Sequence, residues 1–167
     1  MERIINVKGA ILGVDFGDKR TGLAVCDPSR ILASAIGVVA PGGIEKTADA
    51  VAAEALSRGV CAVVVGLPVN MDGSEGGRAA RYRKFARLLE ERLGEGIPVC
   101  LFDERMTTMT AARFLNETNT RGQKRKEVID ALSAQIILQN FIDKLKNTKE
   151  NSLRARLLFL GSIFSID

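Results

Sequence analysis

The sequence contains no histidine, and this absence excludes several classes of enzyme site. Histidine is the commonest general base, and it completes the Ser-His and Cys-His pairs of nucleophilic hydrolases. The three cysteines, Cys26, Cys61 and Cys100, form no Cys-x-x-Cys pair, so a zinc site is not expected either. If the chain is an enzyme, carboxylates, lysine, tyrosine or a metal ion must provide its chemistry.

Aromatic residues and long apolar segments are also scarce. The chain has seven phenylalanines, one tyrosine and no tryptophan, which predicts an aliphatic, alanine-rich core. No segment approaches the roughly 20 apolar residues that cross a membrane, and the N-terminus carries no apolar signal segment. The cysteines lie in or beside apolar runs, which is typical of buried, reduced thiols in an intracellular protein. These features predict a cytoplasmic protein with no membrane partner.

The length of 167 residues suits one domain and leaves little room for a second. We expect residues 1–146 to form this domain. Residues 147–167 then form an apolar tail of unassigned role, which could dock on the domain or serve as a partner surface. The formal net charge of +4 is a mild excess that favours an anionic partner without identifying one.

The spacing of apolar residues and turn residues predicts an α/β fold. Three strands joined by short turns come first and indicate an antiparallel meander. Two buried strands then alternate with helices, which indicates parallel crossover units and therefore a mixed five-stranded sheet flanked by helices. The predicted strands are 11–15, 23–26, 31–39, 60–68 and 97–102, and the predicted helices are 44–56, 82–93, 107–115 and 127–145.

Asp130, near the start of the last predicted helix, is the most informative carboxylate. Helical spacing places it on the face of Ala134, Ile137 and Phe141, which should face the core. An ionised carboxylate there would be costly to bury unless it were paired or bound to metal, and Glu127 would only add repulsion. The alternative is a favourable interaction with the helix dipole, which contributes only about 0.3–1 kcal/mol. The sequence leaves both interpretations open.

Other carboxylates lie at the ends of two predicted strands. Asp15 ends the first strand, and Asp103 and Glu104 end the last buried strand. Together with Asp130 on a covering helix, they can converge at one edge of the sheet. Such a cluster raises its own pKa values unless cations lie within it. Oxygen ligands without histidine or cysteine suit Mg²⁺ or Mn²⁺, and two such ions support in-line hydrolysis of a phosphodiester.

Basic residues gather near these carboxylates and favour a nucleic-acid partner. A single basic cluster is usually solvated surface, but two clusters and a basic pair after Asp15 fit a phosphate backbone. A glycine-rich stretch at 66–77 also offers backbone N–H groups to a phosphate. Such contacts position a nucleic acid without reading its sequence. The predicted nucleic-acid contacts are Lys19, Arg20, Asn70, Arg81, Arg83, Lys84, Arg105, Lys124, Arg125 and Lys126.

Five segments of the sequence resemble those of the YqgF (RuvX) family. They are GVDFGDKRTGLAV, VVVGLPVNMDG, ARYRKFA, DERMTT and KEVIDALSAQIIL, and they cover about residues 10–143 in the order and spacing of the family. Its members are described as ribonuclease H-like nucleases, Holliday junction resolvases and processing factors for the ribosomal RNA precursor. The resemblance therefore implies a ribonuclease H-like fold and a metal-dependent nuclease, with 5′-end maturation of the small-subunit precursor (pre-16S rRNA) as the first expectation.

The resemblance also implies which carboxylates are catalytic. The acidic positions of the family fall on Asp15, on Asp103 and Glu104 in the DER segment, and on Asp130. Neighbouring residues of a strand point to opposite faces, so only one residue of the Asp103–Glu104 pair can easily face the metal. We favour Glu104, which makes Asp15, Glu104 and Asp130 the expected metal ligands. A bulge or the end of the strand would exchange the two faces.

Other functions remain open at the level of sequence. The first alternative is a Holliday junction resolvase, which needs two sites and hence a homodimer. The second is a non-catalytic nucleic-acid-binding factor in ribosome assembly on the same scaffold. The third is a phosphotransferase, because DFGDKRTG resembles the phosphate-binding hairpin of the actin and sugar-kinase superfamily. That superfamily closes two lobes around ATP, and this chain has the length of one.

Overall fold

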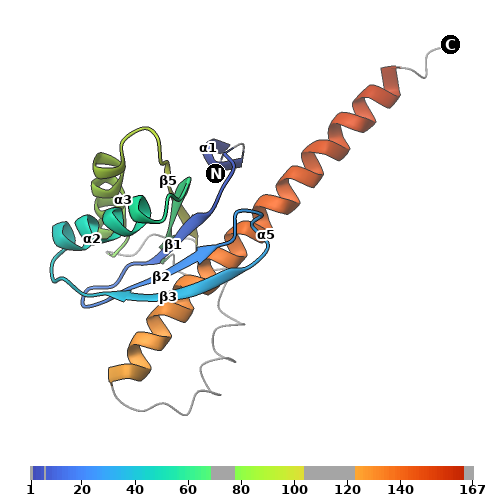
Figure 1. Cartoon of the computed structure of the whole chain (residues 1–167). Coiled ribbons are helices and arrows are strands. Elements are labelled where there is room, and N and C mark those ends of the chain that lie inside the picture. Colours follow the sequence, from blue (N-terminus) through green and yellow to red (C-terminus); the bar gives the residue numbers. More distant parts are fainter. Residues whose placement is uncertain (1, 6, 69–77, 104–122, 164–167) are drawn as a thin grey trace.

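A five-stranded sheet in the order β3-β2-β1-β4-β5 forms the middle layer of the protein (Figure 1). The computed structural model describes residues 2–5, 7–68, 78–103 and 123–163, with the backbone alone for residues 2–3, 123–125 and 152–163. In chain order, the described elements are α1 (Glu2–Ile5), β1 (Ile11–Asp15), β2 (Thr21–Cys26), β3 (Ala33–Val39), α2 (Ile44–Ser57), β4 (Ala62–Leu67), α3 (Ala79–Leu93), β5 (Val99–Asp103) and α5 (Gln123–Ile163).

The pairing of the strands confirms the predicted sheet. β1 pairs antiparallel with β2, and β2 pairs antiparallel with β3. β4 pairs parallel with β1 on the other side, and β5 pairs parallel with β4. The strands begin and end within about two residues of the predicted bounds. The predicted α/β class is therefore confirmed, with a three-stranded meander followed by two parallel strands.

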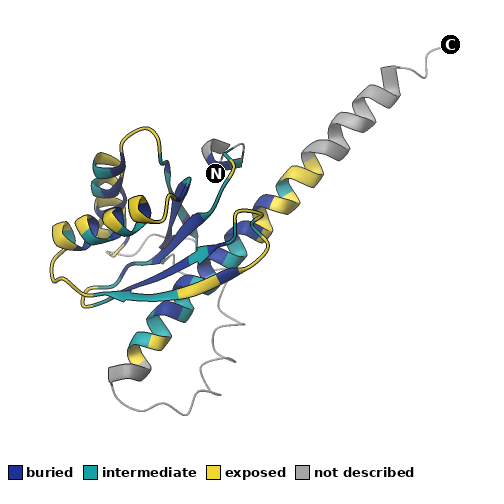
Figure 2. Ribbon diagram, viewed as in Figure 1, coloured by how far each residue is buried: buried dark blue, intermediate teal, exposed yellow. Residues whose placement is uncertain are grey.

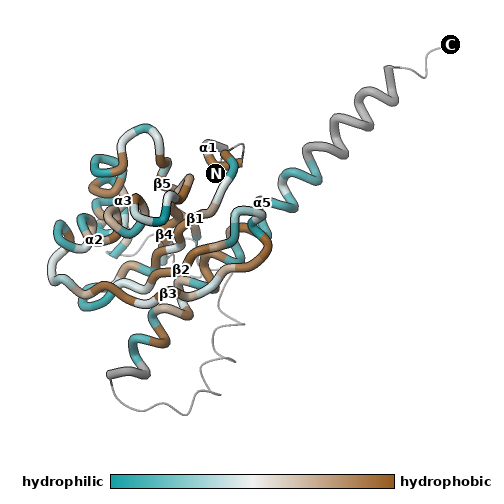
Figure 3. The backbone as a smooth tube through the Cα atoms, viewed as in Figure 1, coloured by the Kyte–Doolittle hydropathy of each residue, from teal (hydrophilic) through white to brown (hydrophobic). Residues whose placement is uncertain are grey.

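Helices cover both faces of the sheet and create two separate cores. On one face, Leu12 of β1 packs with Val51 of α2 and Phe85 of α3. On the opposite face, Ile11 of β1 packs with Phe141 of α5. Figure 2 shows the buried residues along the strands and along the side of α5 that faces them, and Figure 3 shows the same strands as hydrophobic stretches. Successive residues of β1 thus serve different cores, as the two-residue period of a strand requires.

α5 is longer than predicted at both ends. The prediction placed this helix at residues 127–145, because the segments on either side are polar. In the structure it begins at Gln123 and continues to Ile163. The flanking lysine, glutamate, glutamine and arginine residues have high helix propensity, so a polar stretch there need not end the helix. The apolar tail therefore begins as a direct extension of α5.

Three further predictions have different outcomes. The predicted helix at 107–115 lies outside the described residues. Cys26 is buried as expected, whereas Cys61 and Cys100 are only half-buried, and none of these three residues forms a disulfide. Among the described residues, no helix is both long and apolar enough to cross a membrane.

Two glycines let α5 lie directly on the β1–β2 pair. A β-carbon on Gly22 would overlap the carbonyl oxygen of Asp130, and one on Gly13 would lie 2.6 Å from the β-carbon of Leu138. Real β-carbons do not approach other atoms this closely, so any larger residue would push the helix away. Side chains also fix the helix beside β3. Gln135 donates a hydrogen bond to the carbonyl of Ala33 over 2.9 Å, and Gln139 accepts one from the N–H of Ala33 over 2.9 Å.

Gly22→Ala is expected to lower the free energy of unfolding by about 1–3 kcal/mol, because the added methyl group would force α5 from the sheet. Urea unfolding followed by circular dichroism measures the change. Gly96→Ala is the matched control, since a β-carbon there would meet no atom within 4 Å. Similar small effects of the two substitutions would contradict the close contact between Gly22 and α5.

Candidate functional site

The site lies at the edge of the sheet where β1, β4 and β5 end. These strands run parallel, so their last residues meet at the same edge. Asp15 ends β1 and pairs with Gly22 near the start of β2. Because Gly22 contacts the backbone of Asp130, the same edge also receives the early turns of α5. Asp15 and Asp130, which are far apart in the sequence, are thereby brought together.

Asp15 faces α5, and its surroundings disfavour the ionised form. Leu12 and Val14 pack on the α2–α3 face, so alternation directs the side chain of Asp15 to the opposite face. The pKa of Asp15 is raised from 3.8 to about 6, first by burial and second by the negative charge of Asp130. A hydrogen bond with the side chain of Ser133 acts in the opposite direction. Two carboxylates thus interact in a partly buried place, where a nearby positive charge would stabilise their ionised forms.

Arg20 supplies part of this positive charge. Its Nε donates a hydrogen bond to Oδ2 of Asp130 over 2.7 Å, and the two side chains are 22% and 27% exposed. Arg20 lies on the hairpin between β1 and β2, so the ion pair joins that hairpin to α5. Sequence reasoning grouped Arg20 with Lys19 as contacts to phosphate, but the two residues differ here, since Lys19 is exposed.

Ser133 was not identified from the sequence. It lies three residues after Asp130, so α5 presents both side chains on neighbouring positions of one face. Helical spacing from Asp130 could have pointed to it, because the i+3 position of a site residue lies beside that residue. A serine in the interior of a long helix gives no other signal.

Asp103 is the last residue of β5, and the residues before it show which face of the sheet it is on. Phe102 packs in the core under α5, and Leu101 packs in the core under α2 and α3. Strand alternation therefore assigns Asp103 to the α2–α3 face, away from the face of Asp15. Glu104, the favoured metal ligand, lies outside the described residues, as do Asn70 and Arg105. Within the described part of the chain, no three acidic or cysteine residues come together as a metal site.

The predicted basic contacts are spread over several surfaces. Arg81 of α3 lies beside the β1–β2 hairpin, because it pairs with Asp18 over 3.1 Å and lies 5.9 Å from the ring centre of Phe16. Lys84 and Lys126 are exposed on α3 and α5. Arg83 lines a different hollow of about 170 Å³ with Val99 and Leu101 of β5. For Lys124 and Arg125 the structure describes only the helical backbone.

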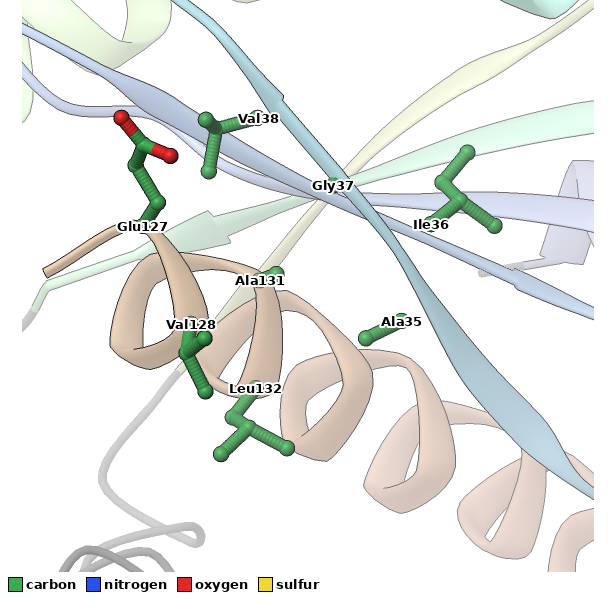
Figure 4. A pocket seen from close by; sticks show the side chains of 8 residues that line it. All are labelled: Ala35, Ile36, Gly37, Val38, Glu127, Val128, Ala131 and Leu132. Carbon is green, nitrogen blue, oxygen red and sulfur yellow. The ribbon is translucent and has the colours of Figure 1, made fainter. Parts of the chain in front are cut away.

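An apolar groove of about 500 Å³ lies beside the site, between β3 and the start of α5 (Figure 4). Residues 35–38 of β3 form one wall, and Val128, Ala131 and Leu132 form the other. Glu127 is the charged residue of its lining. An apolar groove with an acidic side chain would repel a phosphate, so we do not include it in the nucleic-acid surface.

The sequence and the fold are similar to those of known proteins. A family described as "RuvX: Holliday junction resolvase" matches residues 9–144. The chain belongs to the RuvX family. It is 45% identical over 138 residues to a protein of Rhodopseudomonas palustris (strain BisB5) named "Putative pre-16S rRNA nuclease", which covers 83% of this chain and 85% of that protein. A protein of the same name from Pelotomaculum thermopropionicum is 42% identical over 134 residues, covering 80% and 86% of the two chains.

Structural similarity agrees on the fold of this RuvX family member. RuvC from T. thermophilus, in a complex with a Holliday junction substrate, superposes with a TM-score of 0.56 over 84% of this chain and 97% of that chain. The two sequences are only 17% identical, so the match shows a shared ribonuclease H-like fold and no more. The family and fold expected from the five sequence segments are both confirmed.

The raised pKa of Asp15 predicts a characteristic pH dependence of stability. The folded state binds the Asp15 proton more tightly than the unfolded chain, so the free energy of unfolding falls as pH rises from about 4 to about 6 and then levels off. Asp15→Asn removes this fall and is expected to be more stable than wild type at pH 7, by on the order of 2 kcal/mol. Urea unfolding in EDTA from pH 4 to 8 measures both effects.

Asp143→Asn provides the control for this experiment. Asp143 is an exposed carboxylate on the same helix, so its replacement should leave the pH dependence of wild type in place. If Asp15→Asn retained the fall in stability between pH 4 and 6, the burial and repulsion attributed to Asp15 would be wrong.

Proposed function

We propose that this RuvX family member is a metal-dependent nuclease of the two-metal-ion type, and that it matures the 5′ end of pre-16S rRNA in the cytoplasm. The observation that carries the proposal is the meeting of Asp15 and Asp130 at one edge of the sheet. Together they place two carboxylates in a partly buried site where the pKa of Asp15 is raised to about 6. Membership of the RuvX family supports nuclease chemistry.

The residues at the site fit Mg²⁺ or Mn²⁺. All of the candidate ligands are hard oxygen donors, and the mutual repulsion of the two carboxylates would be relieved by a divalent cation. Asp15, Asp130 and, from the sequence, Glu104 would hold it. When bound, two such ions would supply the charge that activates a water molecule and stabilises the leaving oxygen of the phosphodiester.

The remaining residues of the chain would hold the site and the substrate. Ser133 donates a hydrogen bond to Asp15 and restrains its carboxylate. Lys19 on the hairpin and Arg81 on α3, which pairs with Asp18 of the hairpin, are exposed and would contact the phosphate backbone of a nucleic acid. Lys84 on α3 and Lys126 on α5 are also exposed and would add contacts of this kind. These contacts would orient the scissile phosphate over the carboxylates without reading a base sequence.

The names of the relatives favour ribosomal RNA over branched DNA as substrate. The proteins from Rhodopseudomonas palustris and Pelotomaculum thermopropionicum are both named for pre-16S rRNA. The family description names Holliday junction resolution, which keeps branched DNA as the second candidate. A resolvase would act as a homodimer, whereas an RNA-processing enzyme could act as a monomer. We further propose that residues 1–146 form the nuclease domain and that residues 147–167 have a separate role.

Cleavage of two substrates by three proteins tests the proposal. Wild type, Asp15→Asn and Asp130→Asn are each incubated with pre-16S rRNA and with a four-way DNA junction, in Mg²⁺, in Mn²⁺ and in EDTA. We expect wild type to cleave the RNA at its 5′ region only with a divalent ion. Each substitution should reduce the rate by at least about a hundredfold, because it removes a charged metal ligand.

The possible outcomes separate the candidate functions. Equal activity of wild type and Asp15→Asn would overturn the assignment of the site. Faster cleavage of the junction, together with a dimer in light scattering, would favour the resolvase. Binding of precursor RNA with no cleavage in any metal would favour an assembly factor, and tight binding of ATP in calorimetry would favour a phosphotransferase.

A further inference from the structure

Arg20 and Lys19 are neighbours on the β1–β2 hairpin, yet their side chains have different surroundings. Lys19 is exposed. The guanidinium of Arg20 is directed to α5, where its Nε lies 2.7 Å from Oδ2 of Asp130. The side chain of Arg20 is 22% exposed, so most of its surface is covered by the protein. Of these adjacent basic residues, one therefore lies in solvent and the other is directed to α5.

Backbone contacts fix both ends of the Arg20–Asp130 pair. The hairpin is tight, since a β-carbon on Gly17 would overlap the carbonyl oxygen of Arg20. Thr21, the next residue, has no exposed surface and begins β2. On the other side, Asp130 is held where its carbonyl contacts Gly22. An ion pair between two such restrained positions loses little conformational entropy, unlike a pair of mobile surface side chains.

We propose that Arg20 is a positioning residue that orients the Asp130 carboxylate, rather than a contact to the phosphate backbone. The inference rests on the proposed nuclease function. A hydrogen bond to Oδ2 restrains rotation of the carboxylate and leaves Oδ1 available to the divalent cation that Asp130 would hold together with Asp15. Because the charge of Arg20 is already balanced by Asp130, the attraction of the pair for a phosphate is weak. Asp15 is restrained separately, by Ser133.

Binding and turnover measurements distinguish the two roles of Arg20. A phosphate contact contributes to the salt dependence of nucleic-acid binding, with a slope of about 0.7–0.9 per contact in a plot of log affinity against log salt. Arg20→Gln should therefore leave both the affinity for pre-16S rRNA and the salt slope within error of wild type in EDTA. Its kcat in Mg²⁺ should fall by about 10–100-fold, as is typical when a partner of a metal ligand is lost.

Three further variants serve as controls in the same assays. Arg20→Lys should recover part of the lost kcat, because lysine keeps the charge but not the planar geometry. Lys19→Gln should weaken binding and reduce the salt slope. Lys146→Gln, an exposed change on a distant part of α5, should alter neither measurement.

A double-mutant cycle tests the pairing without any cleavage. In EDTA, Arg20→Gln should lower the urea midpoint of wild type, but it should have little effect on Asp130→Asn, where the partner charge is already gone. The proposal is overturned if Arg20→Gln lowers the salt slope as Lys19→Gln does, or if it lowers the midpoint equally in both backgrounds. A wild type that fails to cleave would count against the nuclease function, whereas the cycle still decides the pairing of Arg20.

Discussion

The close contact between α5 and the β1–β2 pair is the constraint on which the site depends. Gly22 and Gly13 provide the space, because a side chain at either position would collide with α5. The contact is made at the edge of the sheet where β1 ends, so it sets the distance between the Asp15 and Asp130 carboxylates. A shift of the helix by the size of one methyl group would change the site before it disturbed the rest of the fold.

The contact brings together the negative charges of Asp15 and Asp130, which repel each other, and each carboxylate has a different hydrogen-bond partner. Asp130 receives a cationic hydrogen-bond donor from the hairpin, and Asp15 receives a neutral one from α5. The result is a site that is organised yet still short of positive charge, since burial and repulsion raise the pKa of Asp15. This shortage is the physical argument for the divalent ions that we propose at the site. The same burial and repulsion lower the free energy of unfolding when Asp15 is ionised.

The two faces of the sheet differ, because Asp15 and Asp130 lie on the α5 face and an apolar core lies on the α2–α3 face. α2 and α3 bury one face through apolar side chains such as Val51 and Phe85, and Phe85 stacks on Phe16 at the start of the hairpin, with the ring centres 4.1 Å apart. The hairpin therefore has a rigid base. Basic residues around it, such as Arg81, are exposed, and we propose them as contacts to a phosphate backbone. The apolar groove between β3 and α5 lies outside this division, and it adjoins the site without sharing its polarity.

The sequence by itself determined the order of strands and helices, the α/β class and the family, because these depend on local periodicity and on segments such as GVDFGDKRTGLAV. It also selected Asp15 and Asp130 as site residues. It missed the length of α5, since polar residues of high helix propensity resemble a loop. Only the tertiary structure decided that Arg20 pairs with Asp130 and that Ser133 contacts Asp15. Both contacts depend on how α5 lies against β1 and the β1–β2 hairpin, and local sequence patterns do not show how segments so far apart in the chain pack together.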